Sequence, residues 1–251
     1  MGWQSTHSSE NFFGIFFPVV DTVDHGVFKM DTPSRCRKIA AAGFQKIFDG
    51  VRPVHRHHFS TDLIGLKHVA NAPELEDKIL STLTAEAEQL PLSEDDMIAV
   101  DWFNGRRSPD DDPLATGSLL NLTLATSAPE IFKSLVEATA FGSRAINERL
   151  AEEGLRIDTI LAVGGISKKS RFVMQTMADV IGLPIRVVSS TQACALGSAM
   201  NASVAAGVHL SVEAAQEAMS SGFDGEYTPN DERHAIYNKL YARYRKAAYG
   251  E

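Results

Sequence analysis

A pair of adjacent glycines directly after an apolar segment is the feature of this sequence best suited to ligand chemistry. The apolar residues 160–163 run into Gly164 and Gly165. Glycine has no side chain, so the backbone can approach a ligand closely at such a point. If the apolar segment is a strand and a helix begins after it, the unpaired amide groups and partial positive charge of the helix start would attract an anion.

Further polar residues follow the glycine pair, and they favour a phosphate or a nucleotide as the ligand. Ser167, Lys168, Lys169 and Arg171 come within a few residues of it. In open α/β sheets, ligands collect at the carboxyl ends of the strands. The alternative is a tight connection that binds nothing. The spacing lacks the third glycine of a dinucleotide fingerprint and the Gly-Lys-Ser/Thr of a P-loop.

The segment DWFNGRRSPD, followed by further acidic residues, is a second candidate for chemistry. It contains Arg106 and Arg107, and the acidic run 110–112 comes directly after them. The arginines could contact phosphate, but a loop held by Arg–Asp pairs is the favoured interpretation. The acidic run is interpreted as a solvated turn, and no metal site is predicted there.

Two other clusters are assigned structural or solvent-exposed roles. His55, His57 and His58 lack a Cys, Asp or Glu partner at a familiar metal-ligand spacing, so they are interpreted as solvated loop residues. The small residues of 193–200 predict a tightly packed helix. Cys194 within it is interpreted as a small buried hydrophobe, because no histidine partner for a nucleophile is evident.

The elements that must position these residues alternate along the chain. Helices are predicted over 74–90, 129–150, 169–181, 192–206 and 231–249, and strands over 97–100, 159–163 and 185–188. Strand, helix, strand, helix indicates an α/β fold, with a parallel sheet and crossover helices. Residues 1–73 are predicted to be an irregular or divergent region, with two short strands within 12–30 and a helix over 35–48. Residues 74–251 form the second predicted domain.

Composition and charge restrict the class of partner. The net charge of −8 argues against a nucleic-acid-binding protein, which would need a basic face. No apolar run approaches the roughly 20 residues of a membrane helix. Two distant cysteines among 251 residues predict a reducing cytoplasm rather than a disulfide framework.

Four segments in this order resemble the FGGY family of carbohydrate kinases, most closely its members that phosphorylate ribulose. They are DWFNGRRSPD, LATSAPEIFKSLVEATAFGSRAI, GGISKKSRFVMQTMADVIGLPI and QACALGSAM, and the resemblance spans about residues 76–248. It implies the C-terminal half of an actin-like ATPase (ribonuclease H-like) fold. It also implies ATP with Mg²⁺ as cofactors and a pentulose, most closely ribulose, as the sugar. The resemblance further implies a role in arabinose catabolism in the cytoplasm. It leaves open whether the protein forms a homodimer.

The resemblance also implies roles for individual residues. Gly164 and Gly165 would contact the phosphates and ribose of ATP, and the segment from Ser167 to Gln175, with Lys168 and Lys169, would border the adenosine pocket. The family's first domain supplies a phosphate loop, the sugar pocket and an aspartate base, none of which is recognisable in this sequence. We therefore expect little or no kinase activity from this chain alone. The alternative is a non-catalytic nucleotide-binding or interaction module.

Overall fold

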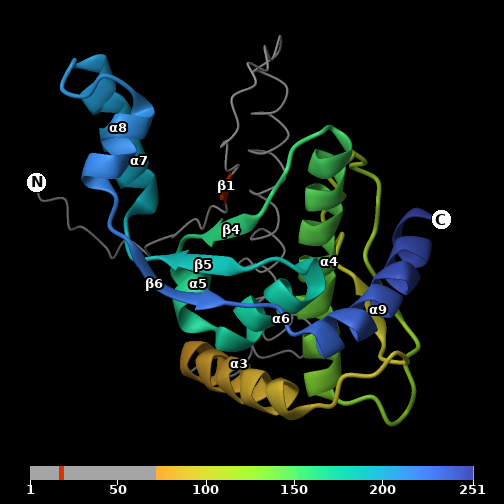
Figure 1. Ribbon diagram of the computed structural model, residues 1–251. Coiled ribbons are helices and arrows are strands. Elements are labelled where there is room, and N and C mark those ends of the chain that lie inside the picture. Colours follow the sequence, from red (N-terminus) through yellow and green to blue (C-terminus); the bar gives the residue numbers. More distant parts are fainter. Residues whose placement is uncertain (1–16, 20–71, 251) are drawn as a thin grey trace, which may run out of the picture.

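The computed structural model describes residues 17–19 and 72–250, which form two sheets with helices around them (Figure 1). The strands predicted within 12–30 fall outside the described residues except for a short strand β1 (Phe17–Val19). The helix predicted over 35–48 and the histidines at 55, 57 and 58 also lie outside the described residues.

The larger sheet has the strand order β1-β4-β5-β6. Strands β4 (Thr159–Ala162) and β5 (Ile185–Val188) are parallel, and helix α6 (Arg171–Ile181) lies in the crossover between them, as predicted. The two outer strands are antiparallel to their neighbours: β1 pairs with β4, and β6 (Phe223–Tyr227) pairs with β5. The sheet is therefore mixed rather than wholly parallel. Strand β6 was not predicted, because it lies at an exposed edge and its sequence FDGEY lacks apolar alternation.

Three long helices form the helical layer beside this sheet. They are α3 (Ala72–Gln89), α4 (Ala128–Glu152) and α9 (Asp231–Tyr249), and each matches its prediction to within two residues. Helix α4 begins with a capping box between Ser127 and Glu130, which satisfies orphan amides at its start. Helix α6 packs against α4 and α9, so it is held by the core.

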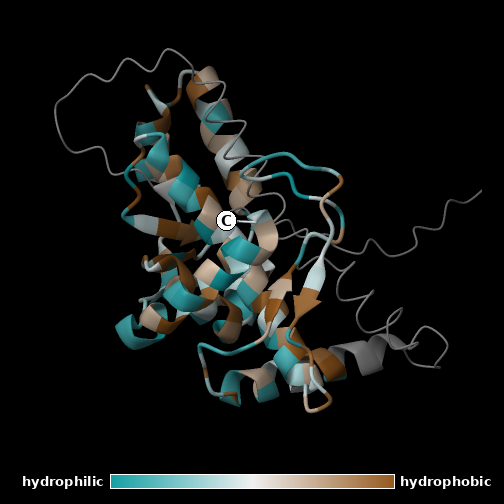
Figure 2. Cartoon of the chain, turned by 90° about the vertical axis from the view of Figure 1, so that its right-hand side faces the viewer, coloured by the Kyte–Doolittle hydropathy of each residue, from teal (hydrophilic) through white to brown (hydrophobic). Residues whose placement is uncertain are grey.

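Aromatic side chains of α9 fill the space beside α4. The ring of Phe141 lies 5.2 Å from that of Tyr244 and 5.7 Å from that of Tyr241, measured between centroids. Tyr237, Leu240 and these two tyrosines are all buried, so this side of the helix faces the core. In Figure 2, viewed from the C-terminal side, the helices carry both hydrophilic and hydrophobic residues, as amphipathic helices do.

A second, smaller sheet carries the DWFNGRRSPD loop. Strand β2 (Ile98–Val100) is fully buried, as predicted, and packs against α4 and α9. It pairs antiparallel with β3 (Ser118–Leu120), which was not predicted because three half-exposed residues show no periodicity. The loop between β2 and β3 therefore has both ends held by one hairpin.

Helices α7 (Ala193–Ala205) and α8 (Val212–Met219) pack against each other and stand apart from α4 and α9 (Figure 1). The prediction that the small residues of α7 are tightly packed is wrong for most of them, and Cys194 is exposed rather than buried. Small residues permit a close approach but do not specify a partner. Among the described residues, Met200 is the buried side chain of α7.

None of the helices in the described part of the chain combines the length and the apolar character that crossing a lipid bilayer requires.

Candidate functional site

The glycine pair forms an open turn at the carboxyl end of β4. Gly164 precedes the short helix α5 (Gly165–Lys169) and has φ +96°, a backbone conformation that residues with a side chain rarely adopt. A Cβ placed on Gly165 would meet no atom of the described residues within 4 Å. The side of the turn where a ligand would approach is therefore not filled by neighbouring side chains.

The helix predicted over 169–181 corresponds to α6 to within two residues, but the short helix α5 lies between it and the glycine pair. The expectation that the glycine pair leads directly into the long helix is therefore wrong. Ser170 separates α5 from α6, with an extended backbone, and its hydroxyl accepts a hydrogen bond of 3.2 Å from the amide of Val173. Serine competes for local backbone groups in this way and favours a helix start. The amides next to the glycines thus belong to the five-residue α5, not to the long helix α6.

Two of the predicted site residues make internal hydrogen bonds. Ser167 is 2% exposed, and its hydroxyl donates to the carbonyl of Gly164 at 2.7 Å. Gln175 donates through Nε2 to Oδ1 of Asp179 at 2.8 Å and to the carbonyl of Thr228 at 2.9 Å. These side chains fix the shape of the turn and the position of α6.

The two lysines of α5 have different surroundings. Lys168 donates through Nζ to the carbonyl of Ser189 at 2.5 Å and to Oδ2 of Asp224 at 2.8 Å. Lys169 is exposed and forms no salt bridge with any described residue. The glycine turn thus has one cation committed to an ion pair and one available to an anionic ligand.

Asp224 is a site residue that the sequence did not reveal. It lies in β6, an unpredicted strand, and 56 positions separate it from Lys168. The hydrogen bond from Lys168, followed by one from Ser189, lowers the pKa of this carboxyl below its usual value. Asp224 is therefore a carboxylate at neutral pH.

The DWFNGRRSPD loop is held largely as expected. Arg106 and Asp112 exchange two backbone hydrogen bonds of 2.8 Å, and their side chains lie 4.0 Å apart. The guanidinium of Arg106 also lies over the ring of Trp102, 4.5 Å from its centroid. The preferred interpretation of a loop held by Arg–Asp contacts is confirmed for Arg106, whereas Arg107 is exposed.

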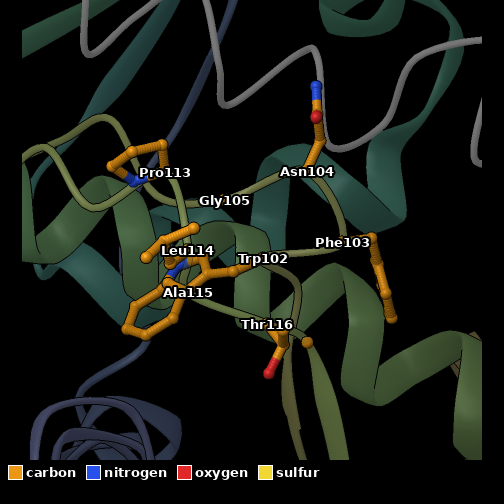
Figure 3. Close-up of a pocket in the computed structure, with 9 residues that line it drawn as sticks. Trp102, Phe103, Asn104, Gly105, Pro113, Leu114, Ala115 and Thr116 are labelled. Carbon is orange, nitrogen blue, oxygen red and sulfur yellow. The ribbon is translucent and has the colours of Figure 1, made fainter.

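An open pocket of about 490 Å³ lies within this loop, and none of its lining residues belongs to the glycine turn (Figure 3). Its lining includes Trp102, Leu114 and Gly117. A Cβ on Gly117 would come within 2.6 Å of the ring of Phe103, so glycine is required for this close approach. Leu114 is 87% exposed and Phe103 is 51% exposed, so the pocket is shallow and open to solvent.

The sequence also did not reveal a buried ionic cluster between α4 and α9. Glu137, 2% exposed, lies 3.7 Å from Lys133 and accepts a hydrogen bond of 3.2 Å from the hydroxyl of Tyr237. Burial raises the pKa of Glu137 to about 7, against the opposing charge of Lys133. The i,i+4 spacing of Lys133 and Glu137 on α4 was the available signal, but the hydrogen-bond partner Tyr237 lies on α9.

The described residues contain no group of three or more His, Cys, Asp or Glu side chains suited to a metal ion. A divalent cation held chiefly by protein side chains is therefore not supported within this part of the chain. Mg²⁺ differs, because it commonly retains waters and binds through one or two carboxylates together with substrate phosphates.

Residues 53–206 match the profile of the FGGY family of carbohydrate kinases, C-terminal domain. The match begins before the boundary predicted between residues 73 and 74, and that boundary stays a prediction. The matched span includes the DWFNGRRSPD loop, the glycine turn and α7.

Individual relatives cover the same region. The chain is 41% identical over 175 residues to a ribulokinase of Vibrio parahaemolyticus, covering 70% of this chain and 31% of that protein. It is 41% identical over 172 residues to a ribulokinase of Bacillus licheniformis, covering 67% of this chain and 31% of that protein. The chain thus spans about a third of the length of the curated relatives that it matches.

A solved structure is similar in the same region. The ligand-bound xylulose kinase of Lactobacillus acidophilus superposes with a TM-score of 0.58 and 27% sequence identity. The superposition covers 65% of this chain and 34% of that one. The actin-like ATPase fold expected for the C-terminal half is therefore supported by both sequence and structure.

Proposed function

Because the chain belongs to the FGGY family of carbohydrate kinases, we propose that it is the nucleotide-binding part of a kinase that transfers phosphate from ATP to a pentulose. Ribulose is the preferred sugar, since the relatives at 41% identity are ribulokinases. The observation that carries the proposal is the open glycine turn at the end of β4, within the matched region.

The geometry of that turn supports the proposed nucleotide contacts. The backbone of Gly164 and Gly165 would lie against the phosphates and ribose, since Gly165 faces open space. Lys169 would supply a cation, because no described carboxylate pairs with it. Ser167 and Gln175 would border the pocket and hold its walls through the hydrogen bonds that they already make.

Mg²⁺ bound mainly through the nucleotide would supply charge neutralisation at its phosphates. The proposed residues of this chain bind and orient the nucleotide. Phosphoryl transfer also needs a positioned hydroxyl and charge stabilisation around the transferred group. Those contributions would come from the part of the enzyme that corresponds to the remaining length of the relatives.

Such a kinase would serve arabinose catabolism in the cytoplasm, with a sugar and a nucleotide as its small-molecule partners and a homodimer left open. The specific alternative is a module that binds nucleotide without catalysing transfer. The coverage of only 31% of the relatives' length favours keeping it as a second candidate.

Nucleotide binding is tested by unfolding the chain with and without Mg·ADP. At 100 times the dissociation constant we expect a stabilisation of about 2.7 kcal/mol. Gly164→Ala should remove this stabilisation, because alanine strains a φ of +96°. The matched control is Gly154→Ala, at φ +85° with no described atom near its Cβ, which should unfold earlier but retain the ligand shift.

Catalysis is tested separately with a coupled assay of ADP release. We expect no ribulose-dependent release from this chain alone, and restored release when the missing part of a ribulokinase is supplied. Robust activity of the isolated chain would show that the expected incompleteness is wrong. No Mg·ADP stabilisation at millimolar ligand would instead overturn nucleotide binding itself.

A further inference from the structure

Lys168 connects the glycine turn to the strands β5 and β6. Its ammonium group donates to the carbonyl of Ser189, directly after β5, and to the carboxylate of Asp224 near the start of β6. The side chain of Lys168 is 26% exposed and that of Asp224 is 50% exposed. A single side chain therefore joins three segments of the fold.

The topology explains why these segments meet. Strands β4 and β5 are parallel, so their carboxyl ends lie at the same edge of the sheet. Strand β6 runs antiparallel to β5, so it begins at that edge. Helix α5 follows β4 there, as Figure 1 shows. Lys168 reaches from α5 to the end of β5 and the start of β6.

These contacts use most of the hydrogen-bond donors of Lys168 and compensate the charge that a phosphate would need. An ammonium group has three donors, and two of them are already used. The carboxylate of Asp224 also compensates its charge, and the lowered pKa of Asp224 agrees with this pairing. Lys169, one residue further along α5, has no such partner among the described residues.

We propose that Lys168 is a positioning residue that holds α5 and the Gly164 turn in place through Asp224 and Ser189, and that it does not bind the phosphates directly. This inference rests on the proposed nucleotide function, and it changes the role that the sequence predicts for Lys168. Charge attraction to the nucleotide is left to Lys169.

Asp224 provides the sharpest test, because the two roles predict opposite results for it. We would measure the Mg·ADP dissociation constant of the full chain for Lys168→Met, Asp224→Asn and the double variant. If Lys168 positions the turn, each single change weakens binding, by about tenfold for Lys168→Met. The double variant is then no weaker than Lys168→Met, because Asp224 acts through Lys168. If Lys168 contacts phosphate directly, Asp224→Asn leaves binding unchanged or tightens it, because it releases the cation.

Hydrogen exchange gives a readout that does not depend on the ligand. The amide of Ser170 donates to the carbonyl of Ile166 at 3.1 Å and closes α5. Its exchange rate should rise in both Lys168→Met and Asp224→Asn, whereas the rate for the Ser220 amide, bonded to Gln216 in α8, should not change. Lys169→Met should leave the Ser170 rate unchanged and weaken Mg·ADP binding.

The two readouts separate failure of this inference from failure of the proposed function. If the wild-type chain does not bind Mg·ADP, the proposed function fails, and the exchange rates alone decide whether the Lys168–Asp224 pair holds α5. Unchanged exchange at Ser170, or normal Mg·ADP binding by Asp224→Asn beside weakened binding by Lys168→Met, would overturn the positioning role.

Discussion

Tyr237 in α9 donates a hydrogen bond of 3.2 Å to Oε1 of Glu137 in α4, and the two residues are only 1% and 2% exposed. The bond joins elements 100 positions apart in the chain. Lys133 lies 3.7 Å from the same carboxyl oxygen and itself contacts Asp96. A titratable carboxyl is therefore held at the centre of the helical layer.

Glu137 should make the stability of the protein depend on pH. Its pKa is about 7 in the folded state and 4.5 without the fold, so the folded state binds the extra proton. This stabilisation is fully present below about pH 4.5 and is lost as the pH rises through about 7. The measurement is the free energy of unfolding by urea between pH 4.5 and 8, for the wild type and for Glu137→Gln.

Contributions from other titrating groups cancel when the unfolding free energy of Glu137→Gln is subtracted from that of the wild type. We expect this difference to fall by up to about 3 kcal/mol between pH 4.5 and 8. A difference that is constant across this range would show that burial does not raise the pKa of Glu137, which Lys133 and Arg233 act to lower.

The hydroxyl of Tyr237 should matter more to stability than that of Tyr244. Tyr237→Phe leaves the buried carboxyl of Glu137 without a donor and should cost about 1–2 kcal/mol. Tyr244 is also fully buried, but its hydroxyl has no hydrogen-bond partner among the described residues. Tyr244→Phe should therefore be neutral or slightly stabilising in urea unfolding at pH 7, and equal losses for the two variants would contradict the assignment.

Asp179 should be one of the most sensitive positions in α6. Its carboxylate is fully buried and accepts from Nε of Arg233 at 2.6 Å and from the amide of Asn230 at 2.9 Å. Asp179→Ala removes these two bonds and the one from Gln175. We expect a loss of about 2–4 kcal/mol, reduced because Arg233 is partly exposed. This loss is measured as the difference in unfolding free energy between the wild type and Asp179→Ala at pH 7.

An exposed ion pair provides the comparison for Asp179. Asp158 lies 2.9 Å from Nε of Arg156, with side chains 45% and 84% exposed. Asp158→Ala should change stability by less than about 0.5 kcal/mol, because solvent screens such pairs. A similar loss in both variants would mean that burial does not determine the contribution of Asp179.

Local patterns in the sequence determined most of the helices and the central strands. The apolar spacing of α4 and α9 and the apolar runs of β4 and β5 depend on neighbours along the chain, so they could be predicted. The glycine pair was also recognisable, since its backbone conformation is a local property. The short helix α5 was not predicted, because five residues are too few to show an apolar periodicity.

Tertiary structure alone decided which side chains meet. Whether Lys168 faces a ligand or Asp224 depends on an edge strand 56 positions away that has no apolar pattern. The burial of Glu137 and the exposure of Cys194 depend on whether another element covers them. Periodicity specifies the faces of an element, but contact with a particular partner is set by how distant elements pack, because the free energy of burial depends on the surface that is covered.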